Sequence, residues 1–126
     1  MSVGAGGVFD LSDPAVTYMT TTNLQLAAGA VVKVCVAPEG CDVIDASEGE
    51  CVLPADADGD VVLDVRIQAG TPPGLYAVVA FPSAATGRWS GRFTTPGGQQ
   101  AELVFAEDRK VLCVRVRRAP TILYIR

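Results

Sequence analysis

Residues 61–81 of this 126-residue chain read VVLDVRIQAGTPPGLYAVVAF, and this stretch decides the fold class. Its first half alternates apolar with polar side chains. The apolar positions are Val61, Leu63, Val65 and Ile67. A period of two is typical of a half-buried strand rather than a helix. Two prolines within residues 70–74 remove backbone donors and end that strand, and the apolar residues 75–81 predict a second one.

The rest of the chain repeats this pattern of short apolar segments between glycine- and proline-rich turns. The clearest further segments are residues 31–36, 88–94, 101–106, 111–117 and 121–126. No segment has a helical period over about ten residues, the length at which a helix becomes recognisable. We therefore predict an all-β, antiparallel two-sheet β-sandwich of about eight to ten short strands, with a barrel as the alternative.

The length fits one domain with a single core. Residues 1–14 are rich in glycine and predict an extended arm, and residues 15–126 predict the sandwich domain. Three apolar residues of the arm, Val8, Phe9 and Leu11, are predicted to contact a neighbouring subunit.

The charge of the chain excludes some partners. The net charge of −4 argues against a nucleic-acid binder. No run approaches the roughly 20 apolar residues that span a bilayer. Residues 1–7 have neither a basic segment nor a long apolar one, so no signal peptide is predicted and a cytoplasmic protein is expected.

The charges are also segregated along the chain. Residues 39–64 contain nine carboxylates and no lysine or arginine, whereas residues 109–126 contain six basic residues and no acid. The two regions are expected to pair internally or to face neighbouring copies; the alternative is two solvated surfaces without a partner.

The chain contains no histidine. This excludes catalysis by Ser-His-Asp or Cys-His groups and metal sites that use histidine ligands. We predict that the protein is not an enzyme.

The turn at residues 56–60 carries three carboxylates, Asp56, Asp58 and Asp60. Hard cations such as Ca²⁺ prefer several carboxylate oxygens on a tight turn. The spacing does not fit an EF-hand loop, so a calcium site would need a second loop. The alternative is a solvated connector, and no other cofactor is predicted.

The four cysteines lack the paired spacing of a zinc site. They are Cys35, Cys41, Cys51 and Cys113. In a reducing compartment free thiols are expected. The disulfide alternatives are Cys41–Cys51, which would close an acidic loop, and Cys35–Cys113, which would join two strands.

Trp89 lies between Arg88 and Arg92. It is a candidate anchor in a protein interface or a platform for a sugar ring, because tryptophan and arginine are common at binding hot spots; the alternative is a core tryptophan. Arg115 and Arg117 project from one face of the predicted strand at residues 111–117 and are further candidate partner-binding residues.

The stretch VVLDVRIQAGTPPGLYAVVAF at residues 61–81 resembles the strand–Gly-x-Pro-Pro-Gly-x-Tyr–strand corner of immunoglobulin-like domains in bacterial surface and phage structural proteins. The resemblance implies an immunoglobulin-like or a jelly-roll-like sandwich. Small all-β proteins with a glycine-rich arm are also similar in type to the proteins that decorate or cement tailed-phage capsids.

Taken together, these features predict a non-enzymatic structural or assembly protein. The expected setting is a virion assembled in a host cytoplasm, with the chain bound to other subunits as a homo-oligomer or on a capsid lattice. The alternative is a carbohydrate- or calcium-dependent adhesion module, based on Trp89 and the turn at residues 56–60.

Overall fold

The structure is a computed structural model that describes residues 1–11, 16–55, 59–95 and 99–118. These residues form thirteen strands and no helix. The strands are β1 (Ser2–Val3), β2 (Val8–Asp10), β3 (Tyr18–Thr20), β4 (Asn23–Leu26), β5 (Val31–Ala37), β6 (Gly40–Cys41), β7 (Val43–Asp45), β8 (Glu50–Val52), β9 (Asp60–Ile67), β10 (Gly74–Ala80), β11 (Arg88–Thr94), β12 (Gln99–Ala106) and β13 (Val111–Arg118). No helix in the described part of the chain is long and apolar enough to cross a membrane.

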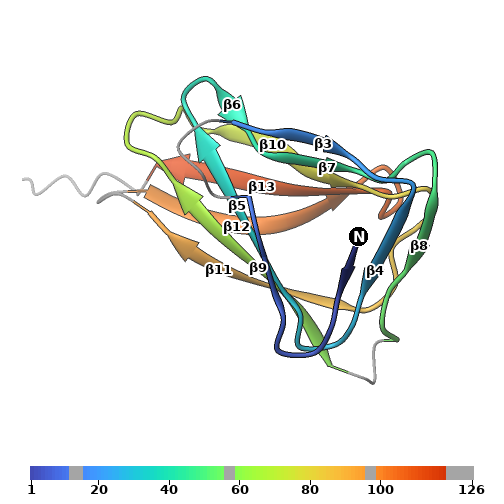
Figure 1. Cartoon of the computed structure of the whole chain (residues 1–126). Helices are drawn as coiled ribbons and strands as arrows, with labels where there is room; N and C mark the ends of the chain where they lie inside the picture. Colours follow the sequence, from blue (N-terminus) through green and yellow to red (C-terminus); the bar gives the residue numbers. More distant parts are fainter. Residues whose placement is uncertain (12–15, 56–58, 96–98, 119–126) are drawn as a thin grey trace, which may run out of the picture.

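The strands form three sheets (Figure 1). Sheet 1 has the order β1-β4-β8, sheet 2 the order β11-β9-β5-β2 with β6 beside β5, and sheet 3 the order β12-β13-β10-β7-β3. The chain visits sheets 1, 2 and 3 in the same order three times. The three coils are β1-β2-β3, then β4-β5-β7, then β8-β9-β10. Each coil adds parallel strands to the sheets, which is the winding of a β-solenoid.

The coils differ in length. In sheet 2 the register runs from Val8 to Val31 and from Val31 to Val62, so one coil takes 23 residues and the next takes 31. Since the turns between strands vary in length, the sequence has no fixed period, although the structure repeats the same order of three strands in each coil.

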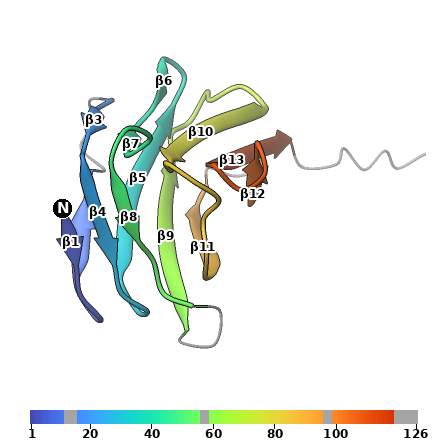
Figure 2. The ribbon, with the colours of Figure 1, turned by 90° about the vertical axis from the view of Figure 1, so that its right-hand side faces the viewer.

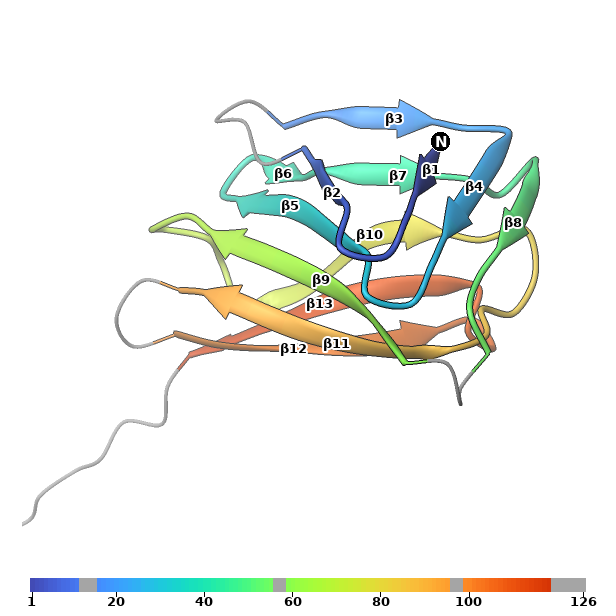
Figure 3. The same ribbon diagram turned by 60° about the horizontal axis from the view of Figure 1, so that its bottom comes forward.

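The two ends of the solenoid are built differently (Figures 2 and 3). At one end β11 adds a last parallel strand to sheet 2, and the antiparallel hairpin of β12 and β13 pairs with β10 to complete sheet 3. At the other end, β1, β2 and β3 are the outermost strands of the three sheets. We call the strands β1, β2 and β3 the open end.

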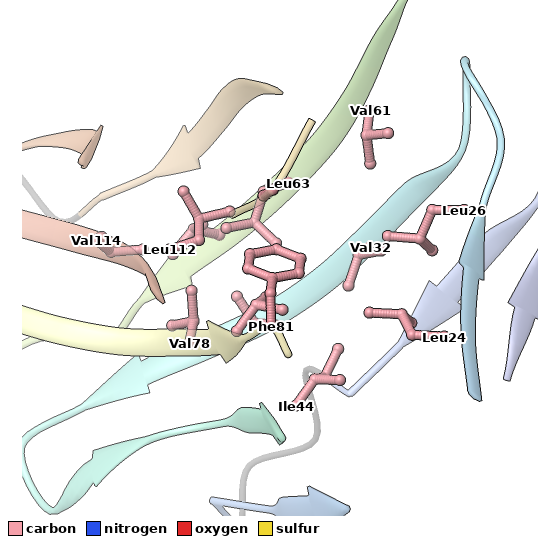
Figure 4. Close-up of a cluster of buried hydrophobic side chains, with 14 of the residues drawn as sticks. Leu24, Leu26, Val32, Ile44, Val61, Leu63, Val78, Phe81, Leu112 and Val114 are labelled. Carbon is pink, nitrogen blue, oxygen red and sulfur yellow. The ribbon is translucent and has the colours of Figure 1, made fainter. Parts of the chain in front are cut away.

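The core fills the inside of the coil (Figure 4). Val61, Leu63, Val65 and Ile67 are all buried, as their alternation predicts. In the parallel register Leu63 lies beside Val32, and equivalent positions of successive coils therefore pack on one another. A stacked core of this kind gains stability from each added coil.

A buried carboxylate joins two coils. Asp42 is fully buried and accepts hydrogen bonds from the backbone N–H of Thr17 (2.7 Å) and of Cys35 (2.8 Å). These bonds tie the start of β3 to the middle of β5, and thereby fix the first coil on the second.

The all-β class is confirmed, but the antiparallel immunoglobulin-like order of strands is not what the described residues adopt. Seven of their ten strand pairings are parallel. The alternation in a strand determines which side chains are buried but not which strand pairs with it. β9 and β10 therefore follow one another in sequence yet belong to different sheets.

The structure of the segment predicted as an extended arm also differs from the prediction. Within residues 1–14, β1 pairs with β4 and β2 pairs with β5, so this segment supplies two of the three strands of the first coil. Phe9 and Leu11 pack against the core, and their apolar side chains explain why the segment lies on the body.

Candidate interaction surfaces

The open end presents backbone groups that face away from the solenoid. The N–H of Val31 donates to the carbonyl of Gly7 (2.9 Å), and the N–H of Leu11 donates to the carbonyl of Lys33 (2.8 Å). In a parallel ladder the residues that bond to a neighbouring strand alternate with residues that point the other way. The N–H and C=O of Val8 therefore point away from β5.

The same end also presents apolar side chains. Five large apolar side chains of the described residues are exposed, and three of them lie on or beside strands of the first coil: Val8 (57%), Val16 (37%) and Tyr18 (65%). Val8 was a predicted partner-binding residue. Tyr18 was missed, because a lone tyrosine in a threonine-rich segment gives no signal of its exposure.

The outer face of sheet 2 carries a ladder of opposite charges. Arg88 contacts Asp60 at 3.1 Å, and Arg92 contacts Asp64 at 3.9 Å. In the register Lys33 lies on the other side of Asp64. Part of the acidic segment is thus paired internally, with arginines of β11 rather than with the basic residues after Arg109.

The predicted calcium residues fall partly outside the described residues. Asp56 and Asp58 lie there, and Asp60 is the carboxylate that pairs with Arg88. Within the described part of the chain, no group of three cysteine or carboxylate side chains is placed to hold a metal ion.

Trp89 packs against the core of the solenoid. Its ring contacts Phe81 edge to face, with centroids 5.6 Å apart, and its Nε1–H donates to the carbonyl of Thr86 (3.4 Å). This geometry favours the core alternative, because the indole already packs against Phe81 and the core and its N–H already has a partner.

Arg115 and Arg117 lie together on the outer face of sheet 3, where both contact Glu102. With Pro73, Leu75 and Arg118 they line a groove of about 570 Å³. We call Leu75, Arg115, Arg117 and Arg118 the basic corner.

Leu75 is half-exposed (52%), whereas its place in the apolar phase of residues 75–81 predicted burial. The register between β10 and β13 shifts between Ala77 and Val79, which marks a β-bulge at Val78. A bulge inserts one extra residue and reverses the phase on its two sides. Leu75 therefore faces out while Val79 faces in. In the sequence, the two consecutive valines at positions 78 and 79 were the signal that could have indicated this bulge.

A second group of charges lies at the opposite end of sheet 3. Tyr18 donates a hydrogen bond through its hydroxyl to Asp45, which also accepts from the N–H of Ser47 (3.0 Å). Hydrogen bonds from Ser47 and then from Tyr18 hold the pKa of Asp45 below its usual value, and the bond to Asp45 raises the pKa of Tyr18. Glu48 is exposed and its charge also raises the pKa of Tyr18. Glu50, at the start of β8, is exposed as well. We call Tyr18, Asp45, Glu48 and Glu50 the acidic corner.

All four cysteines are free thiols in the structure. Burial raises the pKa of Cys41 and of Cys51 to about 11, and burial is also the main cause that raises the pKa of Cys35 and Cys113. Near neutral pH these residues are protonated thiols, a form that is neither nucleophilic nor metal-binding.

Compared with protein-family models, with curated proteins and with solved structures, the chain matches none. The fold and the surfaces described above are therefore the basis for a function.

Proposed function

We propose that this protein is a non-enzymatic structural subunit that binds neighbouring protein subunits in a larger assembly. The observation that carries the proposal is the open end, where the outermost strands of three sheets lie together and where three of the five exposed large apolar side chains gather.

Exposed strand edges pair readily with other chains, and soluble proteins usually protect them with lysine, proline or a covering segment. Solenoids in particular need a terminal cap to stay soluble. The described strands of the open end contain no lysine, arginine or proline. The hairpin of β12 and β13 closes only the other end. A strand edge of a neighbouring subunit would satisfy the outward backbone groups and cover Val8.

The setting that we propose is a virion, with the chain as a capsid decoration or cement protein or as another phage structural component. The support is the sequence resemblance of residues 61–81 and the all-β fold of the described residues. A homo-oligomer is the simplest assembly of this kind.

Sedimentation velocity over a range of protein concentrations at low salt tests the proposal. We expect wild-type protein to assemble, and we expect Val8→Lys to weaken that assembly by about tenfold, which corresponds to about 1.4 kcal/mol. The control is Val52→Lys, since Val52 has nearly the same exposure (59% against 57%) but lies on β8, away from the open end.

Two results would count against the proposal. A wild-type protein that stays monomeric at the highest concentration would refute the assembly role. An assembling protein in which Val8→Lys and Val52→Lys behave alike would refute the open end as the contact.

A further inference from the structure

The outer face of sheet 3 carries charged residues at both ends and residues with small side chains between them. Its five strands run in the order β12-β13-β10-β7-β3. Between Leu75 at one end and Asp45 at the other, the register places Ala77, Ala80, Val104, Ala106 and Val111 on the outer side. None of these side chains stands high above the sheet, so a second flat surface can approach to the usual distance of about 10 Å between packed sheets.

The basic corner combines an exposed apolar side chain with an excess of positive charge. Leu75 lies opposite Arg115 in the register, and Arg117 is exposed on the same face of β13. Arg118, the last residue of β13, is exposed and lines the same groove at the end of the strand. Glu102 contacts Arg115 and Arg117, and it is one carboxylate against three guanidinium groups. The corner therefore retains a net positive charge.

The acidic corner has the complementary composition. Tyr18 is the most exposed of the large apolar side chains (65%). The carboxylates of Asp45 and Glu48 lie close enough to act on its hydroxyl. Glu50 follows at the start of β8, and β3, β7 and β8 contain no basic residue. The turn that joins β12 to β13 lies at the same end of sheet 3, and it adds two acids (Glu107 and Asp108) and two bases (Arg109 and Lys110), hence no net charge.

The two corners cannot meet within one copy. β10 begins and β13 ends at the basic corner, whereas β7 ends at the acidic corner with Asp45, and Figure 3 shows these ends at opposite sides of the sheet. Tyr18 lies on the edge strand β3, two strands away from Leu75 on β10. Two copies related by a two-fold axis, packed with their sheets face to face, place each basic corner on the acidic corner of the other copy. Leu75 of one copy then lies against Tyr18 of the other.

We propose that the outer face of sheet 3 binds a second copy of this chain in a symmetric dimer through these two corners. The inference rests on the proposed function, because it names one of the contacts that an assembling subunit would make. The five strands are three to eight residues long and lie about 4.8 Å apart, so together they cover roughly 450 Å² per copy. The total of roughly 900 Å² lies just below the usual range of specific interfaces, so the dimer is weak and depends on its charges.

A charge exchange tests the dimer. One variant carries Arg117→Glu and Arg118→Glu, and the other carries Glu48→Lys and Glu50→Lys. All four residues are exposed, so both variants are expected to fold. Each variant alone would face like charges at both corners, and we expect its dissociation constant to rise at least about tenfold at low salt.

The equimolar mixture of the two variants tests whether the two corners meet each other in the dimer. In the mixed dimer each corner again meets its opposite charge, so we expect dimers to reappear. At about 0.5 M salt the differences between the proteins should shrink, because the Debye length is then only a few ångströms. Arg66→Glu is the matched control, since Arg66 is exposed on sheet 2 and its reversal should leave dimerisation within twofold of wild type, a change of less than about 0.5 kcal/mol.

Variants that dimerise like wild type, or a mixture that stays monomeric, would overturn the proposed face. If wild-type protein still assembles and Val8→Lys still weakens the assembly, the proposed function survives that failure. If the wild type forms no assembly at low salt, both proposals are overturned.

Discussion

Substituting alanine for Gly49 tests how closely the coils of the solenoid are packed. Gly49 lies in the turn before β8, directly beside Thr22 in the corresponding turn before β4. A Cβ atom on this residue would lie 2.3 Å from the carbonyl oxygen of Thr22 and 2.5 Å from its Cα. These are backbone atoms, which cannot rotate aside as a side chain can. The two coils must therefore separate to accept even one methyl group.

The cost follows from the contacts at that point. A normal contact needs the two segments to move apart by roughly 1 Å, and crowding of this kind typically costs about 1–3 kcal/mol. The N–H of Glu50 donates to the same Thr22 carbonyl at 2.9 Å, and the separation would break that bond, for about another 1 kcal/mol. We expect Gly49→Ala to lower the free energy of unfolding by about 2–4 kcal/mol, and the melting temperature by about 8–15 °C for a domain of this size.

Urea unfolding followed by the fluorescence of the only tryptophan, Trp89, measures the change. Gly4→Ala is the matched control, because a Cβ on Gly4 meets no atom within 4 Å; it should stay within about 0.5 kcal/mol of wild type. If Gly49→Ala unfolds at the same urea concentration as Gly4→Ala, the close packing of the turn before β8 on the turn before β4 is wrong.

Three further predictions concern the core and its buried polar groups. Leu63→Ala should lower the free energy of unfolding by about 2–5 kcal/mol, because Leu63 is fully buried, while Leu75→Ala should change it by less than about 1 kcal/mol; equal losses in urea unfolding would contradict the assigned core. Asp42→Asn should destabilise the fold by at least about 2 kcal/mol, since an amide offers fewer acceptors to the two backbone donors, and a melting temperature like that of wild type would refute that role. Cys41 and Cys51 have pKa values of about 11 against 9.0 for an ordinary thiol, so they hold their protons more tightly when folded. The stability that these two protonated thiols contribute is therefore present below pH 9 and is lost as the pH rises through 11. Thermal melts of wild type and of the variant Cys41→Ala/Cys51→Ala at pH 8 to 11 measure this loss. If the variant loses as much stability as wild type over that range, other groups cause the loss.

The strands themselves could be predicted from local patterns. The alternation of residues 61–67 corresponds to β9 (Asp60–Ile67), and the segment at residues 31–36 corresponds to β5 (Val31–Ala37). The apolar phase of β9 also identified its buried residues correctly. Both predictions succeed for one reason: a strand with one buried face has apolar residues at every second position of its own sequence.

No comparable local pattern in the sequence shows which strands pair with one another. β5 and β9 lie side by side, but their partners are 31 residues apart at Val31 and Val62, and the next step, from Asp60 to Arg88, is 28. Irregular turns of this kind remove the fixed period by which repeat proteins are recognised. The terminal segment at residues 121–126, predicted as a strand, lies outside the described residues.

The bulge at Val78 connects the core to the proposed dimer face. β10 must pair in parallel with β7 on one side, through Val79 and Ala80, and antiparallel with β13 on the other. The extra residue in β10 lets Val78 and Val79 both be buried, and the same change of phase turns Leu75 outward beside Arg115. Closing the solenoid with an antiparallel hairpin therefore also exposes the apolar residue of the basic corner. For this reason the exposure of Leu75 follows from how the fold is completed, and a surface that arises in this way is available in every copy for contact with another.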